Sequence, residues 1–321
     1  MIKLTPSLAV VATMFAGCLA AVPAQAQLSR TFVSAAIGND ANNCDRPTPC
    51  RTFQGAHDKT NTDGEITVLD PGGYGGVTIT KSISIVNDGV GEAGILVSGA
   101  ANGITVNGGP ATYVNLRGIT VQGIGFGDSS TGLRFNSGFS LTVTDCFFRN
   151  QAIVGFDFSP TASGTSNLSI TNTWIADNVR DGVRIGPSAA GMTLRAAFDR
   201  VQVVNNGHTG VFIDGFNSTG TLDVSFSDSM SANNSTGFDV FSSAGKATTR
   251  VLLARSVVAN NTGFAVIVAD APITMVRIGQ STITGNGLTF ALTGAVLQSF
   301  GDNYIAGNAN DTNLQTTIAT K

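Results

Sequence analysis

The chain has 321 residues, a formal net charge of −3 and only 12% charged residues. It contains 39 glycines, and Glu65 and Glu92 are its only glutamates. This composition is poor in helix-forming residues and rich in residues that tolerate turns, so it excludes a helical bundle and favours a turn-rich β protein. The hydrophobic content of 42% is too high for a disordered chain, and the charge balance gives no basic surface for nucleic acid.

Residues 1–26 have the pattern of a secretory signal peptide. Lys3 precedes an apolar run at 8–22, and residues 24–26 read Ala-Gln-Ala, a small-x-small cleavage signal. The apolar run is too short for a comfortable membrane span, so we expect a secreted or periplasmic protein without a transmembrane segment. The alternative is a lipoprotein signal that ends at Cys18, which would then carry a lipid anchor.

Cys44 and Cys50 lie six residues apart in a loop that contains two prolines. Export would place them in an oxidising environment where disulfides persist. We therefore predict a local Cys44–Cys50 disulfide, because a metal site would need more ligands than this loop offers. No metal or other cofactor is predicted.

A short capping helix is expected directly after this loop. Thr48 has the side chain of an N-cap residue, and Pro49 suits the first position of a helix. Phe53, Ala56 and His57 would share one face of that helix. We predict that the helix closes the first end of a repeated structure, with His57 in a packing role.

Residues 114–286 repeat with a period near 27, which is the main signal in the sequence. Each copy begins with two apolar residues in alternation, as in a strand with one buried face. These pairs are Val114/Leu116, Leu141/Val143, Leu168/Ile170, Ala196/Phe198, Val224/Phe226, Val251/Leu253 and Val276/Ile278. Two later columns of each copy are also predicted to point inward, and Cys146 lies in one of them, which gives it a packing role.

Asparagine recurs eight residues after the second apolar position of the later copies. The members are Asn178, Asn206, Asn234, Asn261 and Asn286. Asparagine tolerates the left-handed backbone of a tight turn, and stacked amides can bond to one another between coils. We predict an asparagine ladder, which residues 301–308 extend through Asn308.

Three short strands per repeat, separated by tight turns, fit an all-β parallel β-helix whose coils stack at strand spacing. We expect about 8–10 coils over residues 65–310, with an N-terminal cap at 27–64 and a C-terminal tail at 311–321. The period is too short for a propeller, and the calcium-binding nonapeptide repeat is absent.

The N-terminal motifs resemble a known family. They are Phe32-Val33-Ser34, Gly38-Asn39-Asp40, Pro49-Cys50-Arg51-Thr52, Ala56, Gly64-Glu65-Ile66, Pro71-Gly72 and Tyr74-Gly75. This opening looks like that of right-handed β-helix proteins of the pectin-lyase-like superfamily, particularly bacterial secreted members with no assigned reaction. The resemblance implies a right-handed single-stranded parallel β-helix. It leaves the function open, because that superfamily includes polysaccharide lyases, hydrolases, epimerases and adhesins.

Charged residues recur on the outward side of a strand that follows each asparagine. The outward positions read Arg134, Asp157, Arg184, Phe212, Asp239 and Ala265. The best catalytic constellation on this face is Asp157, Asp181, Arg184, His208 and Asp214. Carboxylates on adjacent coils are close enough to act as acid and base, although alternating Arg and Asp also neutralise a solvent-facing surface. The motifs of the superfamily's hydrolases and pectate lyases are missing, so the resemblance supplies no catalytic residue.

Phe147 and Trp174 fall on an outward column of neighbouring coils, and Phe212 lies on another. Flat aromatic surfaces stack against sugar rings, so these three residues are the candidate carbohydrate-binding set. Alternatively, the loop at 159–167 could fold over Trp174 and make it local core.

These patterns favour an exported monomer that binds extracellular or cell-surface polysaccharide without catalysis. The first alternative is a polysaccharide lyase, glycoside hydrolase or epimerase on the outer face of the β-helix. The second is a structural or adhesive surface protein. The sequence favours the non-enzymatic interpretations, because no family motif for catalysis is present.

Overall fold

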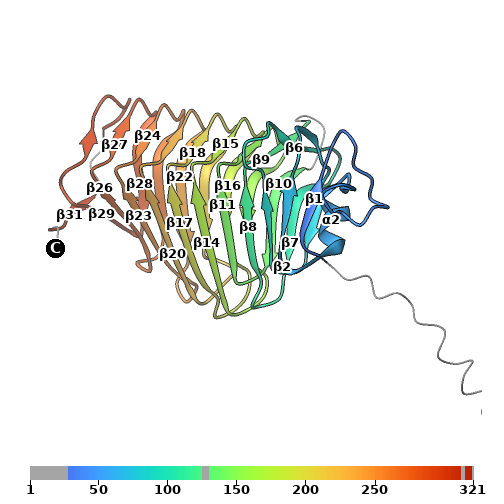
Figure 1. Cartoon of the computed structure of the whole chain (residues 1–321). Helices are drawn as coiled ribbons and strands as arrows, with labels where there is room; N and C mark the ends of the chain where they lie inside the picture. Colours follow the sequence, from blue (N-terminus) through green and yellow to red (C-terminus); the bar gives the residue numbers. More distant parts are fainter. Residues whose placement is uncertain (1–27, 125–129, 312–314, 320–321) are drawn as a thin grey trace, which may run out of the picture.

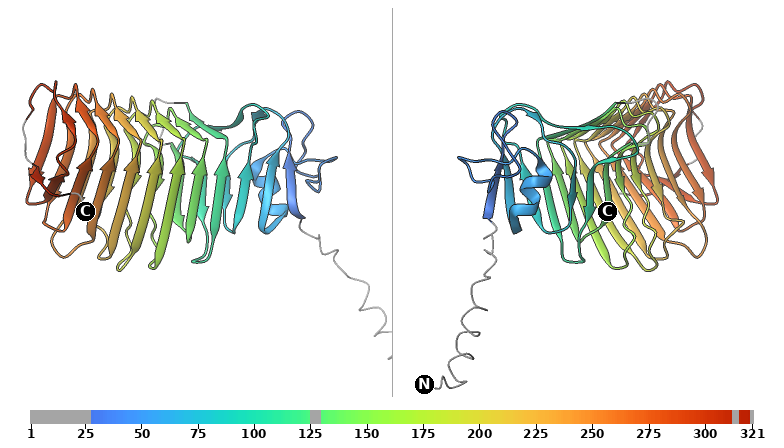
Figure 2. Two further views of the ribbon diagram at one scale, coloured as in Figure 1. Left: turned by 60° about the vertical axis from the view of Figure 1, so that its left-hand side comes forward. Right: turned by 90° about the vertical axis from the view of Figure 1, so that its right-hand side faces the viewer.

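The computed structural model describes residues 28–124, 130–311 and 315–319. The predicted signal peptide and Cys18 lie outside this part of the chain. The described residues form a right-handed parallel β-helix, in which the chain passes through three sheets in turn and then begins the next coil (Figure 1). All pairs of neighbouring strands are parallel, which confirms the predicted fold class. The cap and β31 lie at opposite ends of the stack (Figures 1 and 2).

Sheet A opens each coil. It consists of β1 (Leu28–Val33), β2 (Thr60–Val68), β5 (Ile83–Val86), β8 (Tyr113–Arg117), β11 (Ser140–Thr144), β14 (Thr165–Thr171), β17 (Thr193–Asp199), β20 (Thr221–Ser227), β23 (Thr248–Ala254), β26 (Thr274–Gly279), β29 (Val296–Ser299) and β31 (Thr316–Thr317). β1 therefore lies inside the segment predicted as a cap, and β31 lies inside the predicted tail.

Sheet B follows after a short turn. It consists of β3 (Gly72–Gly73), β6 (Ala93–Val97), β9 (Ile119–Gly123), β12 (Phe147–Arg149), β15 (Trp174–Ala176), β18 (Gln202–Val204), β21 (Met230–Ala232), β24 (Val257–Ala259), β27 (Thr282–Thr284) and β30 (Tyr304–Ile305).

Sheet C closes the coil. It consists of β4 (Val77–Ile79), β7 (Asn102–Asn107), β10 (Thr131–Ser137), β13 (Val154–Phe158), β16 (Asp181–Ile185), β19 (Thr209–Asp214), β22 (Thr236–Ser242), β25 (Phe264–Asp270) and β28 (Leu288–Thr293). The connections from sheet C to sheet A of the next coil vary in length, and those after β13, β16 and β19 are longer than the turns between sheets A and B.

The capping helix α2 (Phe53–Lys59) is present, but its predicted start was wrong. Its N-cap is Thr52, whose hydroxyl accepts a hydrogen bond from the Gly55 amide at 3.0 Å. Thr48 instead bonds the Asp45 carboxylate through its amide and its hydroxyl. Cys50 pairs with β1 as extended backbone, which prevents a helix from starting at the preceding proline. The predicted packing face is confirmed, because Phe53, Ala56 and His57 are buried.

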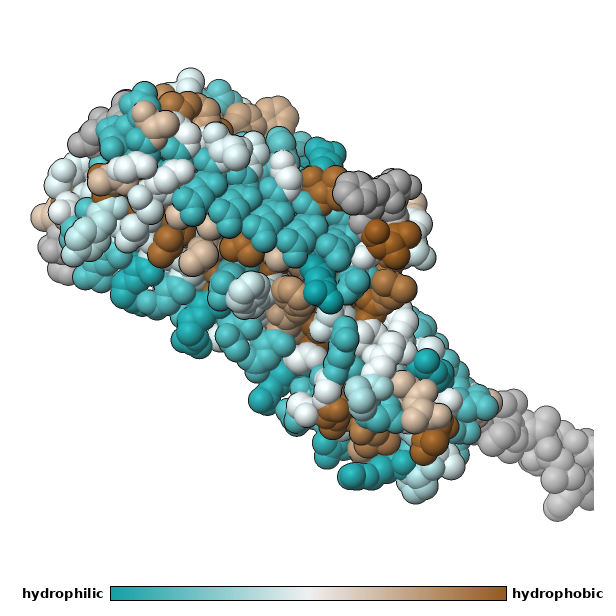
Figure 3. Space-filling view, turned by 90° about the horizontal axis from the view of Figure 1, so that it is seen from above, coloured by the Kyte–Doolittle hydropathy of each residue, from teal (hydrophilic) through white to brown (hydrophobic). Residues whose placement is uncertain are grey.

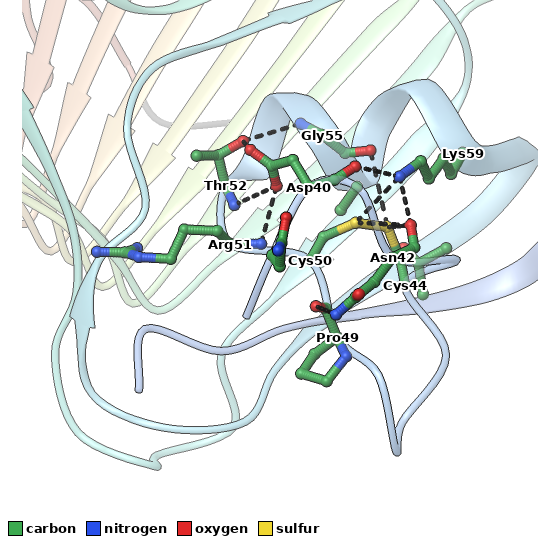
Figure 4. Close-up of a disulfide and its surroundings, with 12 residues drawn as sticks. Asp40, Asn42, Cys44, Pro49, Cys50, Arg51, Thr52, Gly55 and Lys59 are labelled. Atoms are coloured by element: carbon green, nitrogen blue, oxygen red, sulfur yellow. Dashed lines mark hydrogen bonds between the residues drawn. A yellow bond between two sulfur atoms is a disulfide. The ribbon is translucent and has the colours of Figure 1, made fainter. Parts of the chain in front are cut away.

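The predicted disulfide joins Cys44 and Cys50, whose Cα atoms lie 4.7 Å apart. The ammonium group of Lys59 on α2 donates hydrogen bonds to the carbonyl oxygens of Asp40 and Asn42 beside this loop (Figure 4). The Asp40 carboxylate accepts from the backbone amide and the hydroxyl of Thr52. The loop and the helix therefore hold each other against the first coil.

The core is a stack of equivalent side chains from successive coils. Phe198 and Phe226 stack with ring centroids 4.2 Å apart, and both are almost fully buried. Cys146 is a free, buried thiol whose pKa is raised to about 12 by burial, which fits the packing role predicted for it. The inward columns predicted from the repeat are confirmed.

The asparagine ladder is confirmed from Asn178 to Asn308. The Asn206 side-chain amide donates to the Asn234 side-chain oxygen at 2.9 Å, and the same pattern links Asn261 to Asn286 at 2.8 Å. The ladder residues do not themselves supply the left-handed backbone. That role falls to the preceding residue of each coil: Asp177, Asn205, Asn233 and Asn260 have φ between 55° and 58°.

Glycine leads the sheet C strands because the ladder passes directly behind it. A Cβ atom on Gly155 or on Gly210 would lie 2.6 Å from the side-chain nitrogen of Asn178 or Asn234. Only glycine leaves room for the amide there. The glycine and asparagine columns are thus parts of one packing arrangement.

Candidate functional site

The charged face predicted to be catalytic lies on the outer side of sheet C. Strand register places Arg134, Asp157, Arg184, Phe212 and Asp239 in one line across β10, β13, β16, β19 and β22. Asp239 pairs with Ile267 of β25, so Ile267 is the next member of this line. The predicted member, Ala265, lies two residues earlier in the chain and is buried. The alternation of charges along the coils is as predicted.

Asp157 is enclosed by its neighbours on this face. Its carboxylate accepts a hydrogen bond from an Arg134 guanidinium nitrogen at 2.7 Å and another from the Ser159 hydroxyl. Burial raises the pKa of Asp157, while Ser159 and Arg134 oppose that shift. Asp157 is therefore a buried carboxylate that forms an ion pair with the partly exposed Arg134.

Asp181 and His208 form a second pair on adjacent coils. The Asp181 Oδ1 atom lies 2.8 Å from His208 Nδ1 and accepts the Thr209 backbone amide at 3.1 Å. The His208 side chain is 65% exposed, whereas that of Asp181 is 10% exposed. Asp181 is therefore held both by His208 and by the backbone of β19.

Asp214 ends β19 and accepts the Phe216 backbone amide at 2.9 Å. It lies 3.9 Å from the Arg184 guanidinium group. Asp157, Asp181 and Asp214 lie on the outer side of sheet C but are each at most 8% exposed. Coils about 4.8 Å apart leave little space between outward side chains, so arginines and backbone amides enclose these carboxylates.

Asp239 is the carboxylate on this face that the sequence-based constellation missed. Burial raises its pKa from 3.8 to about 6, with further increases from Asp181 and Asp214 and a decrease from His208. Its position in the same outward column as Asp157 was the signal that could have found it. A raised pKa of this kind favours proton exchange closer to neutral pH than that of an ordinary aspartate.

Replacing Asp239 with asparagine is expected to stabilise the fold by about 1–2 kcal/mol above pH 6. The raised pKa means that the folded protein keeps a proton which the unfolded chain releases between pH 4 and 6. Wild-type stability therefore falls as the pH rises through that window, and asparagine removes this loss. Urea unfolding of both proteins at pH 3.5 and 7.5 measures the difference. An equal gain at both pH values would contradict the assignment, and Asp177→Asn on an exposed turn is the matched control.

The predicted carbohydrate-binding aromatics lie on two different faces. Phe147 and Trp174 pair across β12 and β15 of sheet B, with ring centroids 6.2 Å apart and ring planes at 74°. Phe212 lies on sheet C with the Arg184 guanidinium group 5.7 Å from its ring centroid. The structure therefore brings two of the three together and separates the third.

Trp174 is 45% exposed, so the loop at 159–167 does not make it part of a local core. On the outer face of sheet B, the column that contains Trp174 continues through Gln202 to the apolar Met230 and Val257. Figure 3 looks down on this side of the molecule, where hydrophobic residues gather beside a row of hydrophilic ones.

A groove that no pattern in the sequence predicted lies on the outer face of sheet A. It has a volume of about 620 Å³ and crosses β14 to β26. Arg195, Asp223 and Arg250 occupy one backbone position on three successive coils, and Arg277 lies on the next coil. Phe300 lines both this groove and an adjoining depression of about 780 Å³, which also contains Asp302. We call the first of these hollows the sheet A groove.

The arginines of the sheet A groove differ in their partners. Arg250 forms two hydrogen bonds to the Asp223 carboxylate, at 2.6 and 2.9 Å. Arg277 donates to the Gln298 side chain at 2.9 Å. Arg195 is exposed and makes no ion pair with the described residues. The groove therefore offers three guanidinium groups against one carboxylate, which favours an anionic ligand.

Within 28–124, 130–311 and 315–319, no group of three or more His, Cys, Asp or Glu side chains is placed to hold a metal ion. No helix in this part of the chain has the length and apolar character needed to cross a membrane.

These features define a parallel β-helix protein with a charged groove along its stack. No protein-family model and no curated protein matches the sequence. Among solved structures, pectate lyase Pel9A is similar with 18% identity and a TM-score of 0.65, over 91% of this chain and 81% of that one. The A-module of Azotobacter vinelandii mannuronan C-5 epimerase AlgE4 has 12% identity and a TM-score of 0.47, over 80% and 91%. A rhamnogalacturonan lyase has 15% identity and a TM-score of 0.45, over 79% and 74%.

The similarity to Pel9A extends along nearly the whole chain at low identity, so it concerns the fold. The chain therefore has a right-handed parallel β-helix fold similar to that of pectate lyase Pel9A.

Proposed function

We propose that this protein binds an extracellular acidic polysaccharide in the sheet A groove, without cleaving it. The observation that carries the proposal is the excess of guanidinium groups in that groove on a chain whose net charge is −3. Uronate carboxylates recur along such a polysaccharide, and arginines recur along the coils, so one extended ligand can meet several of them. The disulfide fits an extracellular location, and the predicted signal peptide would direct export.

The fold similarity to a pectate lyase makes polygalacturonate the first ligand to test. Arg195 is the most informative residue to substitute, because it is exposed and its guanidinium N–H groups can all donate to a ligand. Arg250 contributes positive charge while it holds Asp223 in place. A ligand carboxylate that pairs with Arg195 would form a charge-assisted hydrogen bond.

Arg195→Ala is expected to weaken polygalacturonate binding about tenfold, which corresponds to about 1.4 kcal/mol. Isothermal titration calorimetry at low salt measures the affinity, which should fall as the salt concentration rises. Arg180→Ala removes the same charge from an exposed turn outside the groove and should leave the affinity unchanged. Equal losses in both variants would indicate a general charge effect and would refute the groove site. Uncharged dextran should not compete.

A second candidate function is polysaccharide cleavage or epimerisation on sheet C. The pKa of Asp239 near 6 favours it, because such a carboxyl group can both accept and donate a proton near neutral pH. The Asp181–His208 pair would be its partner in proton transfer. Loss of glycan turnover in Asp239→Asn and His208→Ala, with unfolding curves that still show a folded protein, would support this candidate over binding alone.

A further inference from the structure

We propose that Phe147 and Trp174 form a second ligand site, specific for an uncharged pyranose ring, on the outer face of sheet B. This inference rests on the proposed polysaccharide function and adds a separate site with a different ligand class. The site lies in a shallow depression of about 370 Å³ lined by Asp145, Cys146, Phe147, Asn172 and Trp174. It shares no residue with the sheet A groove.

The two aromatic rings form a corner. Their planes meet at 74° with centroids 6.2 Å apart, so one ring can lie beneath a ligand while the other stands beside it. Trp174 keeps 45% of its surface exposed, and Phe147 is half-buried against neighbouring apolar side chains. Such a corner fits the C–H face and one edge of a single sugar ring better than a long flat chain.

Polar groups line the opposite side of the same depression. Asp145 and Asn172 are exposed in the turns that precede β12 and β15, with φ of 55° and 48°. The Asn172 side-chain nitrogen donates to Asp145 Oδ1 at 2.6 Å, which fixes both groups at the rim. The side-chain oxygen of Asn172 and the other lone pairs of the Asp145 carboxylate can accept hydrogen bonds from sugar hydroxyls. An apolar floor with a polar rim matches the two sides of a pyranose.

The charges around this depression cancel. Arg117 lies 3.2 Å from the Asp88 carboxylate and 3.6 Å from that of Asp145. The Arg149 guanidinium group lies 5.0 Å from the Phe147 ring centroid and donates to Gln122. Arg200 lies beside Asn172 and pairs with the Asp199 carboxylate at 2.6 Å. Three arginines and three aspartates thus balance around the depression, in contrast with the sheet A groove. The site therefore favours an uncharged sugar.

The experiment uses the full chain and its single tryptophan, Trp174, as a fluorescent reporter located in the site itself. We expect saturable changes in tryptophan emission on titration with uncharged xylotetraose, cellotetraose or galactotetraose, from at least one of them. Phe147→Leu keeps the reporter and should weaken that affinity at least fivefold. Asn172→Gly, which preserves the left-handed turn, should weaken it about threefold.

Three controls separate this site from the other proposals. Phe212→Leu changes an aromatic residue on sheet C and should leave the emission titration unchanged. Arg195→Ala should also leave it unchanged, while it weakens polygalacturonate binding, so the two sites can fail independently. The proposal is overturned if none of the sugars changes the emission of the folded protein, or if Phe147→Leu binds as tightly as the wild type. Emission that shifts with protein concentration alone would also overturn it, because a second copy of the chain would then cover Trp174.

Discussion

Asn234→Ala is expected to destabilise the protein by about 3–5 kcal/mol, which would be a large effect for a single polar substitution. The Asn234 side-chain oxygen accepts both the backbone amide and the side-chain amide of Asn206, each at 2.9 Å. Its side-chain nitrogen donates to the Val203 carbonyl oxygen and to Asn261. Alanine would leave several of these buried groups without partners. The midpoint of equilibrium urea unfolding measures the loss.

The matched control is the adjacent Asn233→Gly. Asn233 is exposed and has φ of 57°, a conformation that glycine adopts without strain. We expect a change within about 0.5 kcal/mol for this variant. A loss of less than 1 kcal/mol for Asn234→Ala would mean that the ladder contributes little to stability.

Phe226→Ala is expected to cost about 3–5 kcal/mol, because it opens a cavity in the stacked core. Phe226 is 1% exposed, stacks on Phe198 and meets Phe238 edge to face at a centroid distance of 5.0 Å. Phe216→Ala, at a ring that is 43% exposed, should cost far less. Thermal and urea unfolding of the two variants provide the comparison. Similar losses for both would show that burial in the stack is not what makes Phe226 important.

The fold could be predicted because each coil repeats the same contacts with its neighbours. A buried position such as that of Phe198 recurs at the same place in the next coil. The period in the sequence is therefore enough to predict the stacked coils. The start of α2 could not be predicted in this way. It depends on Cys50 pairing with β1, a contact between residues that no local pattern relates.

The face on which each candidate side chain lies could be predicted from the sequence, but its exposure to solvent could not. Alternation along a strand correctly placed Asp157 and Trp174 on outer faces. It could not tell that Asp157 would be enclosed by Arg134 while Trp174 would remain exposed, since both outcomes depend on the side chains of neighbouring coils. The sheet A groove was missed for a similar reason. Arg195 and Arg250 are ordinary surface residues in the sequence, and the hollow between them arises only from the stacking of long strands.

The disulfide-bound cap has a consequence for how such a chain can be built. Each coil pairs with the one before it through contacts about 27 residues apart, as with Leu141 and Val114 in sheet A. Contact distance along the chain therefore does not grow as coils are added. The cap supplies β1, the first strand of sheet A, and β2 pairs with it. Each later coil pairs with the coil before it in the same way. Whole coils could be gained or lost during evolution by duplication or deletion, while the template at the N-terminal end stayed the same.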